Sequence, residues 1–252
     1  MSKITKIKGR QVFDSRGNPT VETEIHLDDG SRASAIVPSG ASTGTYEAYE
    51  KRDTNDKRYL GKSVLNPVNL INTIISKKIK NQNIHNQEKI DSLLIKLDGT
   101  KQKSRLGANA ILAVSMAVKK LSSKIKKIPL YKNFLLKNNF QLPFPLMNII
   151  NGGAHANNGL RIQEFMIRPD KAKSFSEAMR ICFLVIQNLR SLIKKKKLST
   201  SVGDEGGFAP MISNNENALK LIVQAIKKSG FKNGKDISIC LDVAANELVR
   251  KK

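Results

Sequence analysis

Two adjacent carboxylates stand in an unusually glycine-rich part of the chain. The sequence VGDEGGFAP at residues 202–210 places Asp204 and Glu205 directly before Gly206 and Gly207. Glycine permits positive φ angles and lets a backbone approach a ligand closely, and ligand-binding residues concentrate on loops held by a rigid scaffold. We therefore predict a rigid loop that presents these carboxylates to a ligand. The alternative, for this stretch alone, is a surface turn with solvated acids.

A second polar stretch has a similar character. The sequence NGGAHANNGLRIQEFMI at residues 151–167 contains His155, Gln163 and Glu164. Imidazole, amide and carboxylate side chains can bind a polar substrate or move a proton. Taken alone, a histidine at this position is more often a loop or capping residue.

Two further side chains carry oxygen atoms, one in a glycine-containing loop and one at the end of a predicted strand. Ser42 lies in the sequence PSGASTG at residues 38–44, where a serine would otherwise be an ordinary turn residue. Asp242 directly follows the apolar segment 237–241, which is predicted to be a strand. Hydroxyl and carboxylate oxygens are ligands that Mg²⁺ accepts, but one carboxylate alone does not make a dedicated Mg²⁺ site.

The formal charge of +23 raises the question of a nucleic-acid partner. Lysine greatly outnumbers arginine, aromatic residues make up only 5% of the chain, and the lysines are spread over almost every predicted helix. This pattern favours solvated helix faces, enriched in lysine by codon bias, over a nucleic-acid surface. The one dense block, 194–197, ends a predicted helix, where the helix dipole favours cations.

The bulk composition is typical of a soluble protein with one large domain or two ordinary ones. The chain has 252 residues, of which 40% are hydrophobic, and no apolar run approaches the ~18 residues that span a bilayer. The amino terminus lacks an apolar signal segment. Cys182 and Cys240 lie among apolar residues and are predicted to be core thiols, so we expect a reducing cytoplasm.

The first part of the sequence predicts strands followed by helices. Segments 11–13, 20–27 and 33–37 have strand character, and a turn signal lies at 28–30. Apolar residues at helical spacing follow Gly61, and the alanine-rich segment 107–118 predicts a buried helix.

In the second part the predicted elements are short apolar strands and long helices. The strands are 144–150, 164–168 and 237–241, and the helices are about 176–195 and 215–229. Functional residues that follow strands and precede helices are typical of a β/α barrel, whose sites lie at the carboxyl ends of its strands.

Together with DSRGNPT at residues 14–20 and LGANAIL at 106–112, these stretches resemble the enolase (phosphopyruvate hydratase) family, from the first residues of the chain to the last few. Ala154 stands where many members carry an acid before the histidine, and Asn157 and Arg161 replace acidic residues that are common in that loop. These departures bear on the conformation of the loop more than on the residues that carry chemistry.

The resemblance implies the fold. We expect an α+β amino-terminal domain over residues 1–135, followed at 140–252 by the first part of a β/α (TIM-like) barrel. The sequence ends soon after the third recognisable strand of a barrel that has eight. We therefore expect a truncated barrel, the amino-terminal half of an enolase, without the lysine base and two further metal carboxylates of the family.

The resemblance also implies a reaction, the glycolytic dehydration of 2-phosphoglycerate to phosphoenolpyruvate by a carbon–oxygen lyase that uses Mg²⁺. Glu205 corresponds to the acid that protonates the leaving hydroxyl group, and Glu164 assists across the same pocket and contacts substrate. His155 and Gln163 correspond to substrate-binding residues. Asp242 and Ser42 correspond to Mg²⁺ ligands.

The sequence leaves other functions open. The chain could be an inactive remnant that binds a partner through its smaller domain, which contributes much of the contact in the homodimers of the family. The charge alone motivates a polybasic RNA- or surface-binding protein, although we regard nucleic acid as the weaker hypothesis. The resemblance implies a cytoplasmic protein without membrane attachment, although intact bacterial members also occur at the cell surface or secreted.

Overall fold

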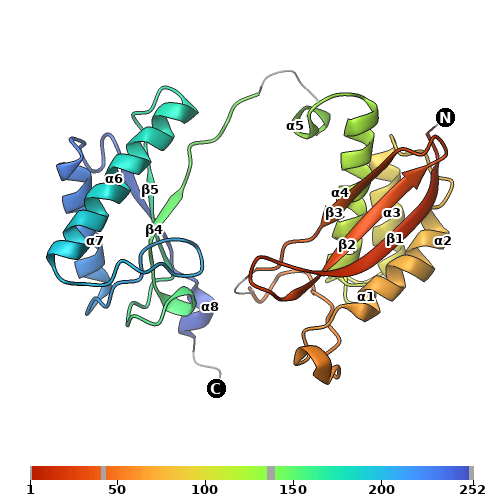
Figure 1. Ribbon diagram of the computed structural model, residues 1–252, viewed down its shortest axis with the longest axis horizontal. Helices are drawn as coiled ribbons and strands as arrows, with labels where there is room; N and C mark the ends of the chain where they lie inside the picture. Colours follow the sequence, from red (N-terminus) through yellow and green to blue (C-terminus); the bar gives the residue numbers. More distant parts are fainter. Residues whose placement is uncertain (1, 41–43, 135–139, 250–252) are drawn as a thin grey trace. The chain divides into compact units, whose positions relative to one another are not determined.

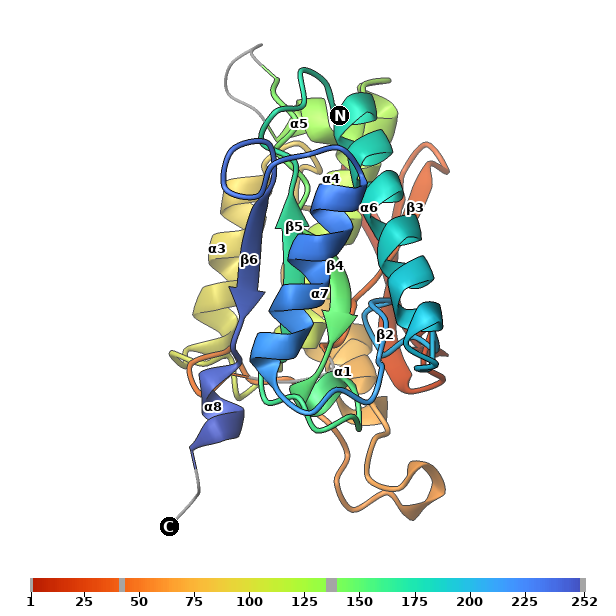
Figure 2. The same ribbon diagram turned by 90° about the vertical axis from the view of Figure 1, so that its left-hand side faces the viewer.

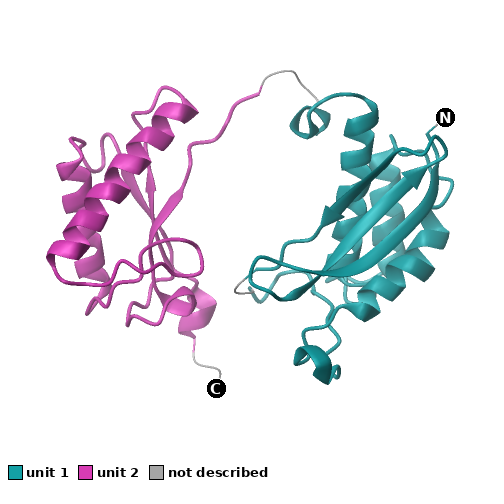
Figure 3. Ribbon diagram, viewed as in Figure 1, with its two compact units in different colours: residues 1–139 teal, residues 140–252 magenta. Residues whose placement is uncertain are grey.

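A computed structural model describes residues 2–40, 44–134 and 140–249. The chain divides into two compact units, residues 1–139 and 140–252 (Figure 3). Each unit has a hydrophobic core and a three-stranded sheet of its own. None of the helices in the described part of the chain is long and apolar enough to span a membrane.

The first unit begins with an antiparallel sheet in the order β1-β2-β3 (Figure 1). The strands are β1 (Ile4–Phe13), β2 (Pro19–Leu27) and β3 (Arg32–Ile36). The turn between β1 and β2 is closed by Asp14, whose Oδ1 accepts the backbone N–H groups of Arg16 and Asn18 at 2.9 Å each. These two bonds lower the pKa of the Asp14 carboxyl, chiefly through Asn18.

β1 is longer than the segment 11–13 that the sequence predicted. Apolar residues do not alternate regularly with polar ones in its first part. The pairing register with β2 shifts there, between Ile4 and Lys6. Ile4 and Ile7 nevertheless both point into the core. A bulge of this kind puts two residues opposite one, which hides the period of two on which strand prediction depends.

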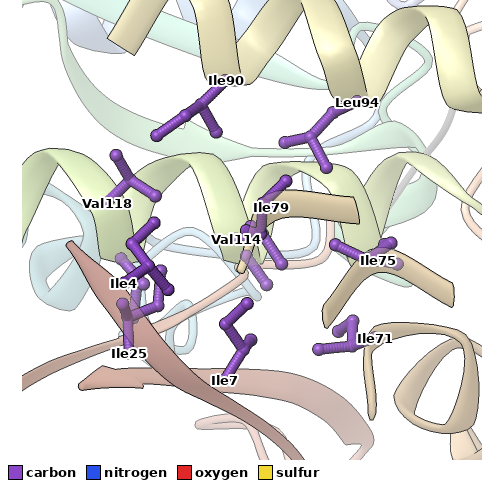
Figure 4. Packing of buried hydrophobic residues seen from close by; sticks show 14 of the residues in the cluster. Ile4, Ile7, Ile25, Ile71, Ile75, Ile79, Ile90, Leu94, Val114 and Val118 are labelled. Atoms are coloured by element: carbon purple, nitrogen blue, oxygen red, sulfur yellow. The ribbon is translucent and has the colours of Figure 1, made fainter. Parts of the chain in front are cut away.

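Helices cover one face of this sheet. Ile4, Ile7 and Ile25 of the sheet pack with residues of the helices in one apolar cluster (Figure 4). The helical elements are η1 (Lys57–Tyr59), α1 (Leu65–Leu70), the π-helical η2 (Ile71–Ile75), α2 (Ser76–Ile79), α3 (Gln87–Asp98), α4 (Ala108–Ile125) and α5 (Leu130–Asn133). The long, buried α4 is the helix that the alanine-rich segment predicted.

The second unit has a sheet in the order β4-β5-β6, in which the central strand runs antiparallel to both neighbours. The strands are β4 (Met147–Asn151), β5 (Glu164–Arg168) and β6 (Ser238–Asp242). The helical elements are η3 (Gly153–His155), α6 (Phe175–Lys195), α7 (Asn215–Lys228) and α8 (Ala245–Leu248). β4 starts after the predicted residue 144, since Pro143 and Pro145 cannot donate ladder hydrogen bonds.

α6 and α7 cover one face of this sheet (Figure 2). Phe165 and Ile167 of β5 point into the resulting core and are fully buried. The alternate residues Glu164 and Met166 point to the other face and are half-buried. The described residues form an open sheet and not a closed barrel. This agrees with the incomplete barrel that the resemblance implied.

Candidate active site

One end of the second sheet gathers polar residues from all three strands. Asn151 is the last residue of β4 and pairs with Glu164, which in turn pairs with Asp242 at the end of β6. The sequence pattern predicted that functional residues follow strands, but Glu164 begins its strand. It reaches the same end of the sheet because β5 runs antiparallel, so that its start lies beside the ends of β4 and β6.

His155 is brought to this end by two glycines that follow β4. The N–H of Gly152 donates to Gln163 O at 2.9 Å, and a methyl group on Gly152 would lie 2.5 Å from Ile162 O. Gly153 has a φ of +52°, which favours glycine. The chain then makes the short turn η3, closed by a bond from His155 N–H to Gly152 O at 3.0 Å, and the His155 side chain is buried.

The glycine-rich loop forms a tight turn beside His155. The N–H of Gly203 donates to Gly207 O at 2.9 Å, and the N–H of Asp204 donates to His155 O at 3.2 Å. Gly206 has a φ of +81°. The glycine-rich segment thus forms a hydrogen-bonded turn, and its three glycines are needed for two reasons. Gly206 supplies the positive φ, whereas Gly203 and Gly207 lie too close to other protein atoms to carry a side chain.

The imidazole of His155 lies between the two predicted catalytic carboxylates. Its Nδ1 is 3.6 Å from Glu164 Oε1, and its Nε2 is 3.9 Å from Glu205 Oε1. One ligand atom from each of the three residues lies within 4.8 Å of the others. The side chain of His155 is 4% exposed and that of Glu205 is 45% exposed. A polar molecule arriving from solvent would therefore reach Glu205 first.

The surroundings of Glu164 raise the pKa of its carboxyl group and so favour the protonated form. Burial raises its pKa most, the negative charges of Asp242 and Glu205 raise it further, and His155 opposes the shift. These causes are the ones expected when acids share a partly buried site. A raised pKa at a cluster of this kind is typical of functional sites, although structural networks also produce it.

Gln163 and His155 have polar atoms with unused hydrogen-bonding capacity. Gln163 is 3% exposed, and its Oε1 makes no hydrogen bond to the described protein; neither does either ring nitrogen of His155. Within the described part of the second unit, the buried side-chain atoms of this kind belong to Asn148, Asn151, His155 and Gln163. Because buried polar atoms usually find partners, the cluster indicates a site for a polar ligand.

Asn151 is a residue of this end that the sequence analysis did not single out. It is fully buried, and its side chain lies against Gly203 and Gly207. The available signal was its place at the start of an Asn-Gly-Gly sequence directly after a strand. That pattern is also typical of an ordinary turn.

Asp242 has a carboxylate that is open to solvent at the end of β6. Its Oδ1 accepts the N–H of Ala244 at 2.9 Å, and Ala244 has a φ of +48°, so the backbone turns away directly after the strand. Ser42 lies outside the described residues. The flanking Ser39 donates from Oγ to Glu50 at 2.9 Å and accepts a bond from Arg16 through its backbone oxygen at 2.5 Å.

The two candidate metal-binding sets differ in chemistry. Mg²⁺ prefers oxygen ligands in an octahedral arrangement, and the exposed carboxylate of Asp242 fits as one of them. The group of His155, Glu164 and Glu205 combines one imidazole nitrogen with two carboxylates, which suits a borderline dication such as Zn²⁺ better than Mg²⁺. The described residues therefore offer one exposed carboxylate at Asp242 and a mixed nitrogen and oxygen donor set beside it.

Comparison with known proteins identifies the family of the chain. Residues 4–134 match the family model "Enolase, N-terminal domain", and residues 139–252 match "Enolase, C-terminal TIM barrel domain". Over 251 residues the chain is 77% identical to the enolase of Pelagibacter ubique (strain HTCC1062). The match covers 100% of this chain and 60% of that relative. The resemblance seen in the sequence and the expected fold class are thus confirmed, and the chain belongs to the enolase family.

Proposed function

We propose that this chain carries the acid half of the active site of a glycolytic phosphopyruvate hydratase, which dehydrates 2-phosphoglycerate to phosphoenolpyruvate. The observation that carries the proposal is the group of His155, Glu164 and Glu205 at one end of the second sheet, in a chain of the enolase family. The reaction removes a proton beside a carboxylate and expels a hydroxyl group, so it needs a base and an acid.

Glu205 is the proposed proton donor to the leaving hydroxyl group. Its side chain is half-exposed, so it can meet a bound substrate, and it sits on a turn that the backbone of His155 helps to hold. Glu164, whose pKa is raised by burial and by neighbouring acids, is the proposed assistant that shares a proton with this site. The negative charge of Glu205 is one of the causes that raise the pKa of Glu164.

His155 and Gln163 are the proposed substrate-binding residues. Both are buried, and both have polar atoms without a hydrogen-bond partner in the described protein. A phosphorylated hydroxy acid offers several oxygens that could satisfy them. Binding there would place the hydroxyl group of the substrate near Glu205, whose Oε1 is 3.9 Å from the His155 ring.

Mg²⁺ is the proposed cofactor, with Asp242 and the loop residue Ser42 as its ligands from this chain. The bound ion would supply positive charge that offsets the charge of the substrate as its carbon acid loses a proton. Asp242 fits this role because its carboxylate is solvent-exposed and directly adjacent in the sheet to Glu164. Its negative charge also raises the pKa of Glu164, so that a cation on Asp242 would reduce that effect.

The complete activity requires groups beyond the described site. The chain spans 60% of the length of the relative it matches, and the family resemblance assigns the lysine base and two more metal carboxylates to the remainder. We propose that this polypeptide alone forms no measurable phosphoenolpyruvate, and that the complete protein is a homodimer. The thiols of Cys182 and Cys240 are both free, which supports a reducing, cytoplasmic location.

The test is complementation. The purified chain is mixed with the carboxyl-terminal part of an enolase, with and without Mg²⁺, and phosphoenolpyruvate formation is followed by its ultraviolet absorbance. Activity is expected in the mixture only, with loss on Glu205→Gln although the complex still forms. Turnover by the chain alone, or a complex that is equally active with Glu205→Gln, would refute the proposed roles. A partner-binding remnant predicts a complex without activity.

A further inference from the structure

The turn that carries Glu205 packs against the side chain of one buried asparagine, as well as against backbone atoms of His155 and β4. A methyl group on Gly203 would lie 2.8 Å from Asn151 Cβ and 3.1 Å from its Cγ. A methyl group on Gly207 would collide with Asn151 Oδ1. The two ends of the turn therefore both lie against the Asn151 amide, and the acid-bearing residues 204 and 205 stand between those ends.

The backbone of Asn151 ties the same turn to the rest of the site. Its N–H donates to Phe208 O at 2.9 Å, directly after the turn, and its O accepts from Asn158 Nδ2 at 2.8 Å. In the sheet it pairs with Glu164. One residue thus connects the strand that holds Glu164 to the turn that holds Glu205.

The Asn151 amide does not act by hydrogen bonding within the described protein. Asn151 is fully buried, and neither Nδ2 nor Oδ1 has a partner there. Its contribution to the turn is therefore its shape. Asn148, three residues earlier on β4, also has both amide atoms buried and unpartnered. It is not among the atoms nearest to Gly203 or Gly207, so it provides a matched control.

We infer that Asn151 is a positioning residue for Glu205, because its side chain fills the space beneath both ends of the turn. Removing the amide in Asn151→Ala empties that space and lets the turn shift, whereas Asn148→Ala removes an equal volume elsewhere. A shift of about 1 Å at a reacting group can lower a rate ~100-fold. Where it concerns turnover, this inference rests on the proposed function.

The first test uses amide hydrogen exchange in the chain itself and needs no activity. Asn151→Ala is expected to loosen the backbone bonds from Gly203 N–H to Gly207 O and from Asp204 N–H to His155 O. Exchange at Gly203 and Asp204 should then speed by roughly two- to tenfold, the worth of about one net hydrogen bond. Exchange in α6 and α7 should stay at the wild-type rate, and Asn148→Ala should leave the turn unchanged. Unchanged exchange at 203 and 204 in Asn151→Ala, or faster exchange throughout the second unit, would overturn the inference.

The second test separates positioning from substrate contact in the complemented enzyme. Asn151→Ala is expected to lower kcat about 10- to 100-fold, with KM for 2-phosphoglycerate unchanged. A raised KM at unchanged kcat would show that Asn151 acts in binding and would refute a positioning role. If the wild-type mixture is inactive, the proposed function fails, and the exchange experiment still decides the role of Asn151 in the turn.

Discussion

Gly207→Ala tests whether close packing beneath the turn that carries Glu205 is the reason for its glycines. The added methyl group would collide with Asn151 Oδ1 and lie 3.0 Å from Ile150 N and 3.1 Å from Ile149 C. Two of these three neighbours are backbone atoms that cannot rotate away. Gly206→Ala is the matched control: its φ of +81° disfavours a side chain, but no atom lies within 4 Å of the added methyl group.

The loss of unfolding free energy in Gly207→Ala can be estimated for two responses of the turn. If the turn stays in place, overpacking costs about 1–3 kcal/mol. If it moves away, the bonds between β4 and Phe208 are lost, which are Asn151 N–H to Phe208 O at 2.9 Å and Phe208 N–H to Ile149 O at 3.0 Å. Two net hydrogen bonds are worth about 1–3 kcal/mol together. Gly206→Ala should cost about 1–2 kcal/mol by backbone strain alone.

The assay follows unfolding of the two units separately. The chain has no Trp, and its 4 tyrosines, Tyr46, Tyr49, Tyr59 and Tyr131, all lie in the first unit. Tyrosine fluorescence therefore reports the first unit, while circular dichroism reports both. Gly207→Ala should lower the urea midpoint of the second unit, measured by circular dichroism, and leave the urea midpoint of tyrosine fluorescence unchanged.

Amide exchange then distinguishes the two glycine variants. Gly207→Ala should speed exchange at Asn151 and Phe208, whereas Gly206→Ala should leave both near wild type. If Gly207→Ala has the urea midpoint of the wild type, the turn is not closely packed against β4. Equal exchange in both variants would show that backbone strain, and not packing, explains the glycines.

Three further predictions concern charge, packing and metal binding. The pKa of Glu164 is raised in the folded state, so its stabilising contribution is present at low pH and is lost as the pH rises through that pKa. The free energy of unfolding of the wild type, relative to that of Glu164→Gln, should therefore fall as the pH rises through that pKa and level off above it. Asn72→Ala removes bonds to Gly9 N at 2.7 Å and Gly9 O at 3.2 Å, which should cost the first unit about 1–3 kcal/mol by tyrosine fluorescence. Zn²⁺ should raise the urea midpoint of the second unit in wild type and not in His155→Ala, and Mg²⁺ should not replace it; equal effects in both proteins would refute the donor set.

Much of the fold could be predicted because several elements follow their intrinsic periods. α6 (Phe175–Lys195) and α7 (Asn215–Lys228) begin and end within about a residue of their predicted bounds. Both start at a polar cap, Ser174 and Asn214, whose side chains accept N–H bonds from the first turn. The amino-terminal part of β1 escaped prediction because its bulge interrupts the alternation.

The direction of β5 could not be predicted from its residues. A five-residue apolar strand has the same pattern in either direction, and only pairing with β4 and β6 settles it. The sequence motifs identified Glu164, Glu205 and His155 as neighbours by resemblance, but not which atoms approach. Asn151 was not predicted as a site residue, because its inferred role depends on contacts with Gly203 and Gly207, more than fifty positions away in the sequence.

The antiparallel strand explains how so few residues form a compact acid site. In a regular β/α unit, residues after successive strands are separated by whole helices and meet only at the carboxyl edge. Here the segment between β4 and β5 stays at one end of the sheet, so His155, Gln163 and Glu164 come from a single connection. The turn at 203–207 then needs only to reach that connection, which it does through Asp204 N–H to His155 O. The bond that joins the Glu205 turn to this connection involves no residue of β6. Removing the charge of Asp242 should therefore lower the pKa of Glu164 without disturbing the Glu205 turn.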